Sequence, residues 1–306
     1  MSRRLVRALV LCGLLAGSSL VGCGGEGGQP GASATAEAAG SAKAPGSKEG
    51  ATASPTGATA ASAAPLKEGG VRFTYAPAVV GERIELAGSS TIDATVTLER
   101  KTTREHTTSK QRATAEVLEV KDGVSVKERV VVNEWDRRSS PPPFNKPFIL
   151  SLAGEKIQVT DDKGAAAPAS ISEWFRSTWE LGRKERFGNL LDGRGVNPGD
   201  ELGDLTDLLA GFQWPGVKAR RVMDRKVTFF GMDGSDARVD YAFDVELDLH
   251  GGTLVLKMQG KLYLAVPSGT AVKNELEWTF TAKSGDADVG SGKGKTVLTA
   301  KRTPPA

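Results

Sequence analysis

The stretch that decides the fold is Val239-Asp240-Tyr241-Ala242-Phe243-Asp244-Val245-Glu246-Leu247-Asp248-Leu249. Its residues alternate strictly between one apolar and one small or acidic face, which is typical of a strand with a dry side and a wet side. Gly251-Gly252 follows as a two-residue turn, and a second alternating run covers 254–264. We expect an antiparallel hairpin in which Leu247 lies opposite Leu256 and Glu246 lies opposite Lys257.

The chain continues this pattern on both sides of the hairpin. A strand over about 274–283 is expected to place Trp278 beside Gly260, and further strands are expected near 295–301 and 227–231. Together they predict an antiparallel meander of about five strands. The glycine-rich run 290–296 resembles a phosphate-binding loop, but Val289 stands where that motif requires glycine. We therefore expect a flexible loop there.

The first half of the chain is also rich in strand patterns. Alternation over 92–99, a hairpin turning at Asp122-Gly123, and two shorter runs near 148–152 and 156–160 predict further strands. Between the halves, the capping-box spacing of Ser170 and Glu173 opens a predicted helix over 171–187, and a shorter helix is expected over about 202–210. The fold class is therefore mainly β (α+β): an antiparallel curved sheet, or half-barrel meanders, with two short mid-chain helices on the concave face.

The amino terminus has the order of a secretory signal. Arg3, Arg4 and Arg7 precede an apolar run over 8–21, and Leu20-Val21-Gly22-Cys23 closes it. Fourteen apolar residues are too few for a bilayer span, which needs about 20. The segment resembles a bacterial lipoprotein signal, with Leu20, Val21 and Gly22 as the lipobox. That resemblance implies removal of 1–22, acylation of Cys23 as the new first residue, and, because Gly24 is not Asp, an outer-membrane destination.

A tether and a globular domain follow the lipidated cysteine. Residues 24–66 contain no Phe, Trp, Tyr, Ile or Val, so we expect them to be disordered, with a root-mean-square span of about 35–40 Å. Residues 67–306 are expected to form the β-rich domain, either as one body or as two β halves, 67–165 and 215–306, around a helical middle, 166–214. The 40 Lys+Arg and 37 Asp+Glu of the chain become 37 and 37 without the three signal arginines. A neutral mature chain gives no support for binding nucleic acid.

Short motifs in the domain resemble those of a family of uncharacterised bacterial envelope lipoproteins. The family carries a Val-x-x-Gly-Asp turn, which matches Val196-Asn197-Pro198-Gly199-Asp200 here, although Glu201-Leu202 follows where the family often has an aromatic residue. The remaining motifs are 81–86, 116–123, 152–157 and 190–192. The resemblance spans about 71–300 and implies no chemistry. The expected shape is also similar to the half-barrels of periplasmic lipoprotein and lipid carriers, which is an analogy of fold only.

Residues that could carry chemistry are sparse. His106 and His250 lie in different halves without a second ligand at zinc spacing, so we expect no metal, no cofactor and no catalytic residue. The acids of 240–248 alternate with core residues and face lysines, which indicates a solvated sheet face. The remaining candidates are aromatic residues that either line an apolar pocket or fill the core: Trp174, Phe175, Trp179 and Trp214.

These observations predict a lipid-anchored protein of the bacterial cell envelope that is not an enzyme. Its domain is expected to bind an envelope protein or an apolar molecule, or to support envelope structure, with the membrane as partner through Cys23. The alternative is a carrier that holds a lipid or a lipoprotein acyl chain in a half-barrel cavity. A hydrolase that uses carboxylates alone is a third and weaker hypothesis.

Overall fold

The computed structural model describes residues 65–98, 101–135, 145–213, 219–249, 252–285 and 287–305. Among them are three helices, α2 (Ala169–Thr178), α3 (Arg186–Leu191) and α4 (Leu205–Gln213). The strands are β1 (Val71–Arg72), β2 (Arg83–Leu98), β3 (Lys101–Lys121), β4 (Val124–Trp135), β5 (Pro147–Ala153), β6 (Lys156–Asp161), β7 (Gly195–Val196), β8 (Ala219–Asp233), β9 (Asp236–Leu249), β10 (Gly252–Ala265), β11 (Ala271–Ser284) and β12 (Ala287–Thr303).

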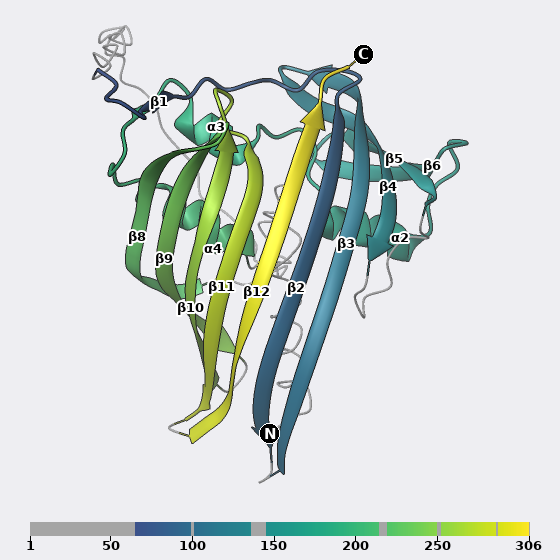
Figure 1. The fold of residues 1–306 in the computed structure, drawn as a ribbon. Coiled ribbons are helices and arrows are strands. Elements are labelled where there is room, and N and C mark those ends of the chain that lie inside the picture. Colours follow the sequence, from purple (N-terminus) through teal and green to yellow (C-terminus); the bar gives the residue numbers. More distant parts are fainter. Residues whose placement is uncertain are drawn as a thin grey trace, which may run out of the picture.

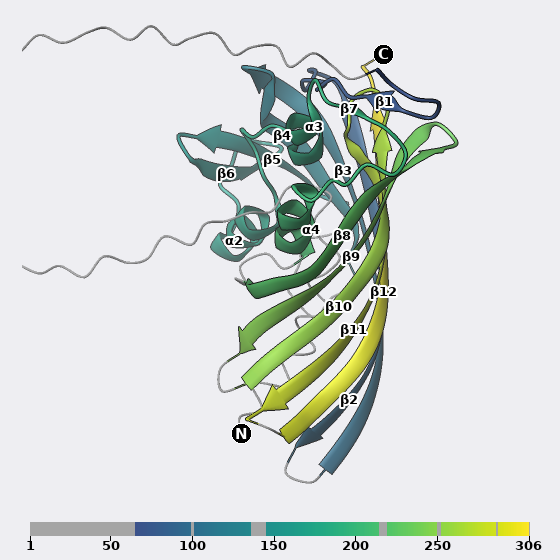
Figure 2. The same cartoon turned by 90° about the vertical axis from the view of Figure 1, so that its left-hand side faces the viewer.

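Ten of these strands form one antiparallel sheet in the order β6-β5-β4-β3-β2-β12-β11-β10-β9-β8 (Figure 1). The strands of the first half and those of the second half are joined edge to edge, because β2 pairs with β12 from Arg83–Thr303 to Val96–Gly290. The sheet is strongly curved, and the helices lie on its concave side (Figure 2). The prediction of a mainly β fold built on a curved antiparallel sheet is confirmed.

The hairpin of β9 and β10 forms, but in a different register from the predicted one. Leu247 pairs with Leu254 and not with Leu256, and Lys257 faces Asp244 and not Glu246. The shift is two residues, so every side chain keeps its predicted face. The same shift affects β11, where Leu276 and not Trp278 stands opposite Gly260.

The prediction of a flexible loop over 290–296 is wrong, because these residues lie inside β12. Gly292 and Gly294 face the core side of the sheet, opposite Phe280 and Trp278 of β11. A Cβ added to either glycine would overlap the aromatic ring beside it. Glycine at positions 292 and 294 leaves the space that the two rings occupy. Residues 290–296 pair with β11 and with β2 as part of a strand.

The middle of the chain holds three described helices, whereas two were predicted. The expected helix over 171–187 ends at Thr178, because Trp179 is extended and Gly182 has a φ of +73°. The amide of Gly182 donates to the Ser125 carbonyl of β4 at 2.7 Å, which ties the break to the sheet. The capping box is also wrong: α2 begins after Pro168, without a side-chain cap.

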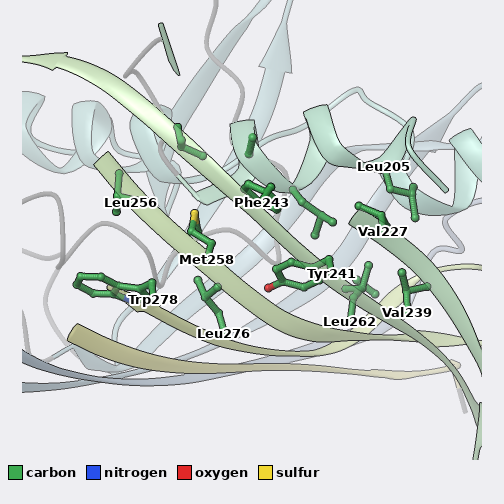
Figure 3. Close-up of a cluster of buried hydrophobic side chains, with 14 of the residues drawn as sticks. Leu205, Val227, Val239, Tyr241, Phe243, Leu256, Met258, Leu262, Leu276 and Trp278 are labelled. Carbon is green, nitrogen blue, oxygen red and sulfur yellow. The ribbon is translucent and has the colours of Figure 1, made fainter. Parts of the chain in front are cut away.

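The concave face carries two separate hydrophobic clusters. The larger lies on β8–β12 under α3 and α4, and Figure 3 shows Leu205 of α4 beside Val227 of β8, with Tyr241 and Met258 on the same face. The smaller lies on β3–β6 under α2. No helix of the described residues is long and apolar enough to cross a bilayer.

Residues 67–72 are held against the domain by the Val-x-x-Gly-Asp turn, Val196–Asp200. β1 pairs with β7, where Val71 lies opposite Val196. Asn197 accepts a 2.7 Å hydrogen bond from the Lys67 amide, and Asp200 caps the turn by accepting from the Asn197 amide at 2.8 Å. Residues 67–72 are thus held beside the mid-chain helices.

Candidate functional site

A cavity of about 100 Å³ lies between the two hydrophobic clusters. Five segments of the sequence build its wall: the chain before β2 with the first residues of that strand, the β3–β4 hairpin, the connection from α2 to α3, the start of β11, and the end of β12. The polar and aromatic lining residues are Tyr75, Glu82, Ser125, Glu128, Trp179, Glu180, Arg183, Lys184, Glu185, Arg186, Phe187, Thr270 and Arg302. The wall is therefore ionic on one part and apolar on the rest.

Glu128 is the most unusual residue of this cavity. It precedes Val130 and Val132 on the core-facing side of β4 and is only 6% exposed. The Trp179 indole Nε1 donates a 2.7 Å hydrogen bond to its Oε2. Burial raises the pKa of the Glu128 carboxyl, and the hydrogen bond from Trp179 only partly opposes that rise. A carboxyl at a core position needs partners, and the described residues supply a neutral one.

The cations of the wall are engaged by other groups. Arg186 contacts Glu180 at 2.6 Å, and Arg183 contacts the same carboxylate at 3.6 Å. Arg302 of β12 lies 3.3 Å from Glu82. None of the ion pairs that the described residues form includes Glu128.

Lys184 and Glu185 complete the wall between α2 and α3. The ammonium of Lys184 lies 5.3 Å from the centre of the Tyr75 ring. Glu185 caps α3 by accepting from the Gly188 amide at 2.6 Å. Burial raises the pKa of Glu185, and this backbone donor works against the rise. Glu185 thus has backbone partners at a helix start, which Glu128 lacks.

Of the four aromatic residues predicted to line a pocket or fill the core, three lie in the described part of the chain, and one of these three lines the cavity. Trp174 and Phe175 belong to the smaller hydrophobic cluster, where their rings meet edge to face at 5.0 Å and Trp174 meets Trp135 at 4.9 Å. Trp179 also packs in this cluster, but in addition lines the cavity. Trp214 lies outside the described residues, as do Leu20, Val21, Gly22 and Cys23. Of the predicted set, the structure brings Trp179 to a cavity.

The other polar residues considered from the sequence lie on the outer face or at turns. His106 Nδ1 is 2.7 Å from Asp93 Oδ1, with both side chains more than half exposed. Asp244 pairs with Lys257 at 3.7 Å across β9 and β10. Asp233 and Asp236 flank the β8–β9 turn. Within the described part of the chain, no group of three or more His, Cys, Asp or Glu could hold a metal ion.

Sequence reasoning did not single out Glu128, Ser125 or Arg302. The sequence does contain one signal: Glu128 has the same parity in its strand as Val130 and Val132, which would place an acid on the apolar face. That signal is ambiguous in the sequence, because Val130-Val131-Val132 is apolar at both parities. Only the pairing of β4 with β3 and β5 decides which face points to the core.

Comparisons with known proteins give no close relative. No family model and no curated protein matches the chain. Among solved structures, the translocator domain of the autotransporter NalP from Neisseria meningitidis is 9% identical, with 74% of this chain and 90% of that chain covered and a TM-score of 0.21. An outer-membrane channel from Pseudomonas putida F1 is 10% identical, covers 74% and 98%, and has a TM-score of 0.17. At these scores neither likeness supports a functional argument.

Proposed function

We propose that this chain is a lipid-anchored, non-enzymatic protein of the bacterial cell envelope, whose curved-sheet domain acts as a binding or structural module. The observation that carries the proposal is Leu20-Val21-Gly22-Cys23 at the end of an apolar run, followed by more than 40 residues of tether composition before β1. An anchor at Cys23 keeps the domain at a membrane, and the tether lets it move away from the lipid surface.

The polar groups of the domain support a role without catalysis. His106 lies outside the lining of the cavity, paired with Asp93 on the outer face. The carboxylates of β9 stand beside lysines and arginines, as Asp240 does with Arg238 at 2.7 Å. A nucleophile, a base and an oxyanion site would have to converge in one place, and these groups are spread over the outer face.

The anchor is tested by membrane fractionation of cells that express the full chain. Cys23→Ser should release the protein from the membrane fraction, whereas Cys12→Ser, a matched change within the signal, should leave it there. Mass spectrometry of the mature amino-terminal peptide should find Cys23 with acyl chains such as palmitate. A mature chain that begins at another residue without lipid would refute the proposal.

The membrane that receives the protein is tested with one further variant. Gly24→Asp places the inner-membrane retention residue of the lipoprotein signal directly after Cys23. On a density gradient the wild-type protein should sediment with the outer membrane, and the variant should move to the inner membrane. Identical distributions would contradict the outer-membrane assignment while leaving the lipid anchor intact.

A carrier of apolar molecules is a second candidate. The observation that favours it is the apolar part of the cavity wall, lined by Trp179, Ile84, Leu86 and Val117, against which one part of an apolar ligand would pack while the rest lies outside the cavity. Native mass spectrometry of protein purified from its host should then show a mass excess equal to a lipid, which disappears after extraction with organic solvent. A single unliganded mass for protein purified without detergent exchange would exclude the carrier and leave the anchored module.

A further inference from the structure

We propose that the cavity beside Glu128 binds the ammonium group of a small primary amine, with the Glu128 carboxylate as its counter-ion. The inference concerns the folded domain and holds whether or not Cys23 carries lipid. It goes beyond the anchored module proposed above by assigning a site and a ligand chemistry.

The first argument is the balance of charge around the cavity. Glu180 is matched by Arg183 and Arg186, Glu82 is matched by Arg302, and Glu185 accepts backbone hydrogen bonds at the start of α3. Glu128 is the lining carboxyl for which the described residues supply no cation within 4 Å. A buried carboxylate without a cation in contact is strongly disfavoured, even with a neutral donor such as Trp179 beside it, so ionised Glu128 favours a ligand that brings a positive charge into the cavity.

The second argument is the set of acceptors and rings around that carboxyl. The Ser125 hydroxyl lies in the same wall with its oxygen buried; it is close enough to Glu128 to lower the pKa of that carboxyl, but it makes no hydrogen bond of regular geometry with the described residues. An ammonium has three donors, and the oxygens of Glu128 and Ser125 are acceptors in the lining of the cavity. Trp179, which donates to Glu128, adds an aromatic ring to the same lining. The geometry therefore favours a cation with hydrogen-bond donors over an anion or a neutral apolar group.

The third argument is size. One water needs roughly 10–15 Å³ by this measure of volume, so a cavity of about 100 Å³ holds several waters or a short amine. The space is too small for a whole lipid. Arg183 and Lys184 are exposed at the edge of the wall, where they would meet an anionic group attached to the amine. The same ammonium chemistry is found in a free amine and in an ethanolamine headgroup.

The test is isothermal titration of the purified full-length mature protein in a non-ionic detergent. Ethylammonium chloride is the probe, with potassium chloride and ethanol as controls for charge and for shape. Ethylammonium should bind at least ten-fold more tightly than either control. Glu128→Gln, which keeps an acceptor for Trp179, should weaken the binding of ethylammonium at least ten-fold. Glu155→Gln, in the exposed β5–β6 turn, should leave it unchanged.

Ethanolamine and dihexanoylphosphatidylethanolamine separate the two sources of the ligand. Tighter binding of the lipid assigns a headgroup, whereas equal or tighter binding of ethanolamine assigns a soluble amine, and both results support the site. The proposal is overturned if ethylammonium gives no heat at millimolar concentration, or if folded Glu128→Gln protein binds it as the wild type does. Circular dichroism of the variant confirms that it is folded. None of these outcomes depends on the result of the fractionation of Cys23→Ser.

Discussion

The indole ring of Trp278 on β11 lies over Gly294 of the neighbouring strand β12, in the space where a Cβ on Gly294 would stand. Phe280 lies over Gly292 in the same way, and the two rings are 6.0 Å apart. Both aromatic side chains are buried. This arrangement explains why a strand at the centre of the sheet contains glycine at alternate positions, where glycine normally weakens a strand.

Gly294→Ala should therefore destabilise the domain by about 1–3 kcal/mol, because the new methyl group displaces a packed indole. Urea denaturation of the full chain measures the change. Gly203→Ala is the matched control, since a Cβ at Gly203 meets nothing within 4 Å. Adding Trp278→Leu to Gly294→Ala should cost less than the sum of the two single changes. Equal stability of the Gly294 and Gly203 variants would show that the ring does not need the space.

A second prediction concerns the buried hydrogen bond between Tyr241 and Asn274. The Tyr241 hydroxyl donates to Asn274 Oδ1 at 2.8 Å, and both residues are at most 3% exposed. Tyr241→Phe should lower the free energy of unfolding by about 1–3 kcal/mol, because it leaves the Asn274 oxygen without that donor in the core. Tyr263→Phe removes a hydroxyl from a half-buried ring on β10 and should change stability by less than about 0.5 kcal/mol. A similar small effect at both positions would refute the prediction.

The sequence predicted the faces of the strands much better than their partners. Alternation predicts that the Leu247 side chain lies on the core face of the sheet. It does not choose the partner, because pairing Leu247 with either Leu254 or Leu256 buries apolar surface. Lys257 has an acid across the strand pair in either register, Glu246 in the predicted one and Asp244 in the observed one. Local patterns therefore leave the two registers nearly equal, and the connection between β9 and β10 decides between them.

The candidate site was harder to predict, because it is assembled from distant segments. Glu128 and Trp179 are 51 residues apart; they meet because the chain leaves α2 after Thr178 and then contacts β4 through Gly182. Arg302 reaches Glu82 across 220 residues through the pairing of β12 with β2. Aromatic residues could be recognised as candidates from composition, but a buried acid could not be told from a solvated one before the inward face of β4 was known.

A third prediction follows from the raised pKa of Glu128. In the unfolded chain this carboxyl titrates near its ordinary value of 4.5, and in the folded state it titrates higher. Between the two pKa values the folded state holds more proton, so the free energy of unfolding falls as the pH rises through that window. Glu128→Gln removes this contribution, and its stability relative to wild type should rise with pH. Glu185 shifts in the same direction and keeps part of the slope in the variant.

Urea denaturation at a series of pH values from 4 to 9 measures the Glu128 contribution. The curves of wild-type and Glu128→Gln protein should diverge toward high pH. Glu155→Gln should follow the wild-type curve with a constant offset. Parallel curves for all three proteins would mean that the Glu128 carboxyl has the same pKa in the folded and unfolded states. That result would contradict the prediction drawn from its burial, at 6% exposure.

The fourth prediction separates the two roles of Trp179, which fills the core and donates to Glu128. Trp179→Phe keeps an aromatic ring but removes the donor, which raises the pKa of Glu128 further. Below that pKa the variant loses packing and a hydrogen bond between neutral groups, and above it the lost hydrogen bond is the stronger one to an ionised carboxyl. The part of the loss at high pH that comes from this hydrogen bond should be about 1.5–3 kcal/mol, the usual contribution of a hydrogen bond to a charged group. Trp174→Phe, whose ring packs against Trp135 and Phe175, loses packing alone and should show the same deficit at pH 4.5 and pH 8.5. If the deficit of Trp179→Phe were equally flat with pH, the indole would act on the fold by packing alone, without stabilising the charge on Glu128.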